Sequence, residues 1–127
     1  MSNSATPPTR VLTVDDSASM RALLNHALAS SGFEVHQADD GQAALEWRVV
    51  NDVDVVITDI NMPRLDGCGL IERLRAGSRH ADRPILVLTT ESAPEKKQRA
   101  REAGATGWIV KPFDPDKLVA AVRRVAH

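Results

Sequence analysis

The sequence predicts an α/β domain in which five strands and five helices alternate along the chain. Short apolar segments of strand length alternate with longer segments of helical periodicity. Two strand segments, residues 54–58 and 85–88, are apolar almost without interruption, as in strands that are covered on both faces. Capping residues and turn residues separate the segments. Strands joined by helices of this length pair in parallel through right-handed crossovers.

The first strand–helix unit follows a polar segment, residues 1–9, which we expect to be a flexible N-terminal tail. Residues 10–14 (RVLTV) are rich in β-branched side chains and predict a strand. Ser17 is a suitable N-cap for the helix that follows, and the Ser-Gly pair at 31–32 ends it. The apolar residues of this helix recur at its period: Met20, Leu23, Leu24, Ala27 and Leu28.

The second and third units have the same form. Residues 33–38 predict a strand, and Asp40-Gly41 opens a helix. Residues 54–58 predict the third strand, residues 61–63 (Asn-Met-Pro) break the chain, and Asp66-Gly67 makes a turn. The apolar positions of the two helices are Ala44, Leu45 and Val49 in one, and Leu70, Ile71 and Leu74 in the other.

The last two units complete the pattern. Residues 85–88 predict a strand, residues 93–103 a polar helix, and residues 107–110 the fifth strand. Asp114 caps the last helix, with Pro115 at its first position. This helix buries Leu118, Val122 and either Val119 or Val125. Residues 10–127 are therefore expected to form one domain.

Composition limits the function classes. The single cysteine, Cys68, allows no internal disulfide and is compatible with a reducing compartment. No apolar run approaches the ~18 residues of a membrane span, and the N-terminus lacks the pattern of a signal peptide. We therefore expect a cytoplasmic protein that does not insert in a membrane. The net charge of −1 excludes a strongly basic, non-specific nucleic-acid binder.

Residues that carry reactive groups stand directly after four of the predicted strands. They are Asp15 and Asp16 after the first strand, Asp59 after the third, Thr89, Thr90 and Glu91 after the fourth, and Lys111 and Pro112 after the fifth. The carboxyl ends of parallel strands lie at one edge of the sheet, where ligands bind in open α/β sheets. We therefore expect these side chains to share one site.

The residue types suit phosphoryl transfer to a carboxylate. Three neighbouring carboxylates repel one another, so either the pKa of one of them rises or a cation lies among them. Mg²⁺ prefers such hard oxygen ligands. An aspartate can act as the nucleophile toward phosphorus, and Lys111 and Thr89 can stabilise the added charge. Asp59 is the best candidate nucleophile, since it leaves the central apolar strand beside a tight loop. Taken singly, each residue would more often be a cap, a turn residue or a solvated side chain.

The combined motifs resemble a known family. They are Val14-Asp15-Asp16-Ser17, Thr58 to Pro63 with Asp66-Gly67, Leu88-Thr89-Thr90, and Lys111-Pro112-Phe113, with 30 residues from Asp59 to Thr89 and 52 from Asp59 to Lys111. This pattern resembles the two-component response-regulator receiver domain, and within it the single-domain chemotaxis regulators of the CheY type. The resemblance covers nearly the whole chain and implies the (βα)5 flavodoxin-like receiver fold with sheet order 2-1-3-4-5.

The resemblance also implies a role for each site residue. Asp59 would accept the phosphoryl group from the phosphohistidine of a histidine kinase. Asp16, Asp59 and the Asn61 backbone carbonyl would ligate Mg²⁺, with Asp15 acting through water. Thr89 and Lys111 would contact the phosphoryl oxygens, and the peptide bond before Pro112 would be cis.

Four further residues would affect switching and the lifetime of the phosphate. Asn61 and Glu91 stand two residues beyond Asp59 and Thr89, at positions that tune dephosphorylation in the family, and Thr90 lies beside them. Trp108 stands three residues before Lys111, where the family often has Tyr, Phe or His, and this aromatic ring turns inward on activation. An indole is larger and carries an N–H, so a fixed packing role for Trp108 stays open.

Three functions compete at this point. The leading one is a phosphorylation-switched binding module, expected to be a monomer, with a chemotaxis histidine kinase upstream and a flagellar-motor switch protein or phosphatase downstream. The second is a phosphotransfer intermediate or phosphate sink in another two-component pathway. An enzyme on the same scaffold is disfavoured, because the P-loop pattern is absent and the aspartates after the first strand, Asp15 and Asp16, are adjacent, where an aspartate-nucleophile phosphatase usually has Asp-x-Asp. The domain would catalyse only its own phosphorylation and dephosphorylation. A DNA-binding regulator is disfavoured too, since we expect no helix-turn-helix after the last predicted helix.

Overall fold

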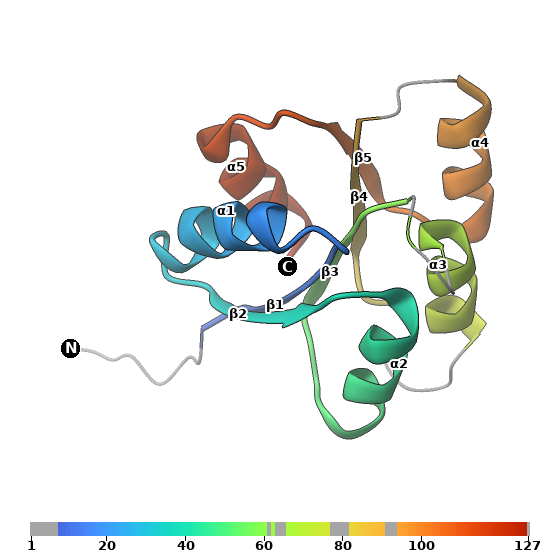
Figure 1. Ribbon diagram of the computed structural model, residues 1–127, viewed down its shortest axis with the longest axis horizontal. Helices are drawn as coiled ribbons and strands as arrows, with labels where there is room; N and C mark the ends of the chain where they lie inside the picture. The colour runs from blue at the N-terminus through green and yellow to red at the C-terminus, as the bar shows by residue number, and fades with distance from the viewer. Residues whose placement is uncertain (1–7, 61, 63–65, 77–81, 91–93, 127) are drawn as a thin grey trace.

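A computed structural model describes residues 8–60, 62, 66–76, 82–90 and 94–126 of the chain. The strands are β1 (Arg10–Val14), β2 (Glu34–Ala38), β3 (Val55–Thr58), β4 (Ile85–Thr89) and β5 (Gly107–Val110). The helices are α1 (Ala18–Ala29), α2 (Gly41–Val50), α3 (Gly67–Ala76), α4 (Pro94–Ala103) and α5 (Pro115–Val125). All the strand pairs are parallel, and the sheet order is β2-β1-β3-β4-β5 (Figure 1). The predicted fold class and strand order are therefore confirmed.

Helices cover both faces of the sheet. In Figure 1, α1 and α5 lie on one side of the strands, and α2, α3 and α4 lie on the other. Two apolar clusters correspond to these layers, because successive side chains of a strand point to opposite faces. Val11 and Ile57 pack with α1 and α5, whereas Leu12 and Val56 pack with α2 and α3. Burial on both faces explains why β3 and β4 are continuously apolar, with each of their residues buried.

The predicted helix caps are present. Ser17 Oγ accepts a hydrogen bond from the Met20 amide at 3.2 Å, and Asp40 Oδ1 accepts one from the Ala43 amide at 2.8 Å. Asp114 Oδ1 accepts from the Asp116 amide at 2.9 Å, with Pro115 beginning α5. Each cap pairs a helix N–H group that has no partner within its own helix. These caps fix where α1, α2 and α5 begin relative to the preceding strands.

The element boundaries differ from the predicted ones by small amounts. The second and third strands begin one residue later than expected, and β4 extends one residue further, to Thr89. The third helix begins at Gly67, before the first apolar residue that predicted it. Of the expected tail, residues 1–7 lie outside the described part, while the Thr9 carbonyl accepts a hydrogen bond from the Glu34 amide at 2.9 Å. Among the described residues, no helix is long and apolar enough to cross a membrane.

Candidate functional site

The carboxyl ends of β1, β3, β4 and β5 lie at the same edge of the sheet, with β4 and β5 extending two residues further than β1 and β3. Val14 pairs with Thr58 in the sheet register, and Thr89 pairs with Val110. The Asp59 amide donates to the Val14 carbonyl at 2.9 Å. The Lys111 amide likewise donates to the Thr89 carbonyl, at 2.8 Å. These backbone bonds extend the parallel pairing just past the strand ends, so that the residues that follow lie at one edge.

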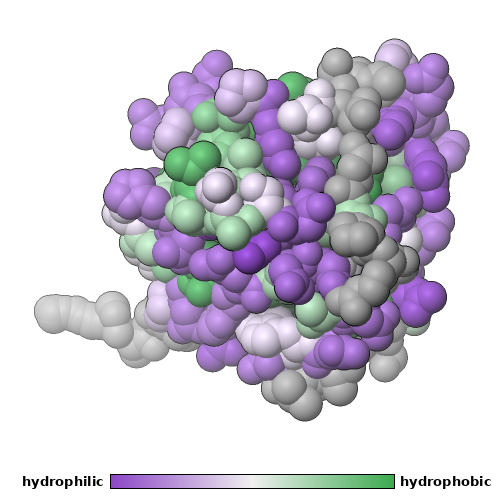
Figure 2. All heavy atoms as spheres, viewed as in Figure 1, coloured by the Kyte–Doolittle hydropathy of each residue, from purple (hydrophilic) through white to green (hydrophobic). Residues whose placement is uncertain are grey.

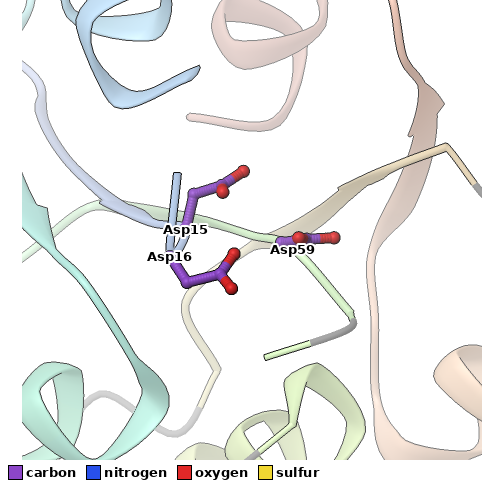
Figure 3. Close-up of side chains that lie close together, drawn as sticks. All are labelled: Asp15, Asp16 and Asp59. Atoms are coloured by element: carbon purple, nitrogen blue, oxygen red, sulfur yellow. The ribbon is translucent and has the colours of Figure 1, made fainter. Parts of the chain in front are cut away.

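Three carboxylates meet at this edge. One oxygen from each of Asp15, Asp16 and Asp59 lies within 4.8 Å of the others (Figure 3). Figure 3 shows the three side chains pointing toward the same region from the ends of two strands. Asp15 is buried at 1% exposure, and Asp16 is exposed. The cluster therefore has one face in the protein interior and one face open to solvent.

Lys111 supplies a cation from the opposite side. Its Nζ lies 2.9 Å from Asp15 Oδ2 and 3.6 Å from Asp59 Oδ2. The side chains of Lys111, Asp15 and Asp59 are only 10%, 2% and 12% exposed. A buried carboxylate is costly unless it is paired and hydrogen-bonded. Asp15 meets both conditions, because its Oδ1 also accepts from the Ser17 amide at 2.9 Å.

The other predicted site residues are distributed as follows. Thr89 is fully buried at the end of β4, and Thr90 is exposed. The Lys111–Pro112 peptide bond is cis, as the resemblance implied. Asn61 and Glu91 lie outside the described residues, so the predicted metal contact of the Asn61 carbonyl and the tuning role of Glu91 stay predictions.

Trp108 lies on β5 with its ring partly buried. Its Nε1 is buried and has no hydrogen-bond partner within the described part of the chain. The Lys97 ammonium of α4 lies over the indole ring, 5.9 Å from its centroid. Leaving a buried donor unpaired typically costs about 1–3 kcal/mol. A second ring position in which Nε1 donates a hydrogen bond would therefore compete with the one in this structure.

Gly67, which the sequence pattern indicated only as part of a turn, also shapes the site. A Cβ at Gly67 would lie 2.4 Å from the Asp59 carbonyl oxygen and 2.7 Å from the Ile60 Cα. The Gly67 amide also donates to the Ile60 carbonyl at 2.9 Å. The absence of a side chain thus lets the start of α3 pack against the backbone that carries Asp59. A glycine eight residues after the candidate nucleophile was the available signal.

Cys68 follows Gly67 and is buried in the core. Burial raises the pKa of its thiol, so the thiolate is disfavoured at neutral pH. Cys68 therefore acts as a small packing residue.

Comparison with known proteins identifies the family. The model of the response regulator receiver domain matches residues 11–123. The chain belongs to the response regulator receiver domain family. Its sheet order, and the acidic cluster at the strand ends, are those of a receiver domain.

Individual relatives include regulators of different kinds. The chain is 40% identical over 111 residues to the chemotaxis protein CheY1 of Helicobacter pylori, covering 86% of this chain and 90% of CheY1. It is 42% identical over 123 residues to the transcriptional regulatory protein PrrA of Mycobacterium tuberculosis, covering 97% of this chain and 52% of PrrA. The chain thus spans about half the length of PrrA and of the similar response regulator MprA.

The solved structures give the same picture of the fold. The chemotaxis protein CheY4 of Vibrio cholerae superimposes with a TM-score of 0.89 at 45% identity, covering 93% of this chain and 98% of that one. A response regulator from Chloroflexus aurantiacus gives a TM-score of 0.90 at 34% identity, covering 94% and 98%.

The acidic cluster fits the Mg²⁺ that receiver domains bind at an acidic pocket. Its donors are all carboxylate oxygens, which Mg²⁺ prefers. Both oxygens of Asp15 already have protein partners, Lys111 and the Ser17 amide. Asp16 is exposed beside them. The donor set therefore suits a cation that keeps part of its water shell, with Asp16 and Asp59 as the nearest candidates for direct ligands.

We expect substitution of Gly67 by alanine to disturb the site and the fold together. The added Cβ meets backbone atoms, which cannot rotate away, so the start of α3 or the Asp59 segment must move. The free energy of unfolding should fall by about 2 kcal/mol, as for overpacked cores. Mg²⁺ binding should weaken as well. Urea denaturation and isothermal titration with Mg²⁺ measure the two effects.

Cys68→Ala is the matched control, because it changes the neighbouring helix residue without approaching Asp59. It should lower stability moderately and leave Mg²⁺ affinity unchanged. If Gly67→Ala had the stability and Mg²⁺ affinity of the native protein, the close approach at Gly67 would have no part in fixing Asp59.

Proposed function

We propose that this receiver domain accepts a phosphoryl group on Asp59 in a Mg²⁺-dependent reaction and thereby changes its affinity for a partner protein. The observation that carries the proposal is the position of Asp59, which lies beside the carboxylates of Asp15 and Asp16 and within 3.6 Å of the ammonium of Lys111. A carboxylate in this position can act as a nucleophile toward phosphorus. The negative charge of the aspartyl phosphate that forms is then stabilised by cationic groups that are already at the site.

The reaction follows from these groups. An Asp59 oxygen attacks the phosphorus of a phosphohistidine, the new P–O bond forms as the P–N bond breaks, and the histidine leaves as imidazole. Lys111 stays near the Asp59 carboxylate and pairs with a phosphoryl oxygen. Thr89, buried at the end of β4, donates its hydroxyl to another. Mg²⁺, when bound, neutralises the charge that develops on the phosphoryl oxygens.

Hydrolysis of the aspartyl phosphate reverses the modification. Water attacks the phosphorus, and inorganic phosphate leaves as the Asp59 carboxylate is restored. We assign the tuning of this step to Asn61, Thr90 and Glu91, which follow Asp59 and Thr89 in the sequence. The domain then catalyses only its own phosphorylation and dephosphorylation, and it turns over no separate substrate.

The proposed phosphodonor is a histidine kinase, because receiver domains take their phosphoryl group from such kinases. A protein donor must cover the rim of the site to bring its phosphohistidine to Asp59. Next to the site lies an apolar hollow of about 180 Å³, lined by Met20, Leu23, His26, Ala27, Pro112, Phe113 and Pro115. Figure 2 shows hydrophobic residues gathered over α1 and the nearby start of α5. Leu23 is 57% exposed there, which suits contact with a protein.

The proposed pathway is chemotaxis, with a flagellar-motor switch protein or a phosphatase as the downstream partner. The support is the likeness to CheY1 and CheY4 along nearly their whole length. A phosphotransfer intermediate or phosphate sink in another two-component pathway is the alternative, and the likeness to the transcriptional regulator PrrA favours a pathway outside chemotaxis. A binding experiment separates the chemotaxis pathway from the alternative. It identifies which partner protein binds the phosphate-mimic form of the domain more tightly than the unmodified form.

Incubation with acetyl phosphate tests the chemistry without a kinase. We expect intact-mass spectrometry to show one phosphoryl adduct in the presence of Mg²⁺ and none when the metal is chelated. Asp59→Asn should show no adduct, while Asp54→Asn, which removes a carboxylate at the opposite end of β3, should react like the native protein. An adduct that persists in Asp59→Asn would contradict the assignment of the nucleophile.

Trp108 provides a test of the conformational switch. Trp47 and Trp108 are the two tryptophans of the chain, so Trp47→Phe leaves Trp108 as the single indole emitter. We expect Mg²⁺ with beryllium fluoride to change the Trp108 emission, because the unpaired Nε1 gains from a new environment. The same addition to the Trp47→Phe, Asp59→Asn double variant should change nothing. Phosphorylation with constant Trp108 emission would mean that this ring is a fixed packing residue.

A further inference from the structure

The direction of the Asp16 carboxylate is set by the backbone of the β1–α1 loop. No hydrogen bond or ion pair holds this carboxylate within the described residues, and the side chain is exposed. Since the peptide bond is planar, the orientation of the peptide unit between Asp15 and Asp16 places the Asp16 Cα and so restrains the directions that its side chain can take. Whatever holds that peptide unit therefore holds one of the two candidate direct ligands of Mg²⁺.

Arg21 is the side chain that holds it. Its Nη1 donates to the backbone carbonyl of Asp15 at 2.5 Å. A hydrogen bond from a charged guanidinium is stronger than one between neutral groups. The Arg21 amide also donates to the Ser17 carbonyl at 3.0 Å, so the residue is fixed relative to the loop at its backbone as well. Arg21 thus closes the loop that carries Asp16 onto the helix that follows it.

The remaining contacts of the loop act on Asp15 and not on the Asp15–Asp16 peptide carbonyl. The Asp15 amide donates to the Ala38 carbonyl at 3.2 Å, and the Asp15 carboxylate is held by Lys111 and by the Ser17 amide. The Ser17 hydrogen bond closes a turn across the Asp15–Asp16 peptide unit and limits its rotation, but it does not pair the Asp15 carbonyl oxygen. The Arg21 hydrogen bond pairs that oxygen and adds a second restraint on the peptide unit.

Packing does not force Arg21 into this position. Its side chain lines an open hollow of about 420 Å³ together with Gln37, Asp39 and Trp47. The guanidinium has room to move away from the loop, so the hydrogen bond and not the surrounding core keeps it on the Asp15 carbonyl. Removal of the guanidinium consequently opens no core cavity.

We propose that Arg21 is a positioning residue of the Mg²⁺ site, which acts through the Asp15 carbonyl to aim the Asp16 carboxylate at the metal. This inference rests on the proposed function, since the metal is the one that the phosphoryl transfer uses. Arg21 does not touch the reacting atoms. Loss of the positioning role is expected to weaken Mg²⁺ binding. Loss of a nearby positive charge alone would strengthen the binding of a cation, so the two effects have opposite signs.

The test is isothermal titration with Mg²⁺ of the native protein, Arg21→Met, Arg21→Gln and the control Arg124→Met. We expect Arg21→Met to weaken Mg²⁺ binding about 10-fold, as loss of a group that orients a ligand does, although the variant carries one positive charge fewer. Arg21→Gln keeps a neutral donor and should lose less. Arg124→Met removes the same charge from an exposed position of α5 and should bind Mg²⁺ like the native protein.

A second readout needs no metal. In ¹H–¹⁵N spectra of the metal-free proteins, the amide signals of Asp16 and Ser17 should shift or broaden in Arg21→Met, while signals of the β4 and α5 amides stay in place. Thermal denaturation should show nearly native stability. If Arg21→Met does not fold, Arg21→Gln decides between the outcomes by the same two measurements.

Native or tighter Mg²⁺ binding by Arg21→Met, with unmoved Asp16 and Ser17 amides, would overturn the positioning role. That result is distinct from failure of the proposed function, in which the native protein itself would form no adduct with acetyl phosphate in Mg²⁺. An adduct in the native protein with unchanged Arg21→Met affinity would reject only the role of Arg21.

Discussion

The ion pairs of Lys111 join parts of the chain that the sequence keeps far apart. Its ammonium lies 2.9 Å from Asp15 and 3.6 Å from Asp59, and so connects the end of β5 to the ends of β1 and β3. Without this cation, a carboxylate that is 1% exposed would be buried beside two others. Such a cluster is stable only when charge of the opposite sign is present. The site is therefore organised around one lysine before any metal or phosphoryl group arrives.

The parallel sheet makes this arrangement possible, and small contacts refine it. Parallel pairing brings every carboxyl end to one edge, which places the groups near one another but does not aim them. Gly67 lets α3 approach the Asp59 backbone, and Arg21 fixes the peptide unit before Asp16. Side chains of a site are positioned more accurately by rigid helices and strands with a few specific restraints than by loops alone. In this protein, one glycine and one arginine provide restraints on two of the three carboxylates.

Much of this architecture was predictable from the sequence, because alternation of strands and helices leaves few topologies. The meeting of Asp15, Asp59 and Lys111 followed from their places after strands. The boundaries of α3 and β4 did not, since Gly67 and Thr89 are polar or small residues that periodicity does not detect. Long-range contacts were also hidden. Arg75, for example, donates to the Gly104 carbonyl at 2.8 Å across 29 residues, and no local pattern encodes that partner.

The central claim is that the acidic edge of the sheet holds a divalent cation beside a phosphoryl group on Asp59. The most direct measurement is a crystal structure with Mn²⁺, which replaces Mg²⁺ and gives an anomalous signal, and with beryllium fluoride as the phosphoryl mimic. The account predicts one anomalous peak in contact with the carboxylates of Asp16 and Asp59, and beryllium fluoride on Asp59 in contact with Lys111. An anomalous peak elsewhere, or beryllium fluoride absent from Asp59 in crystals that hold Mn²⁺, would contradict it.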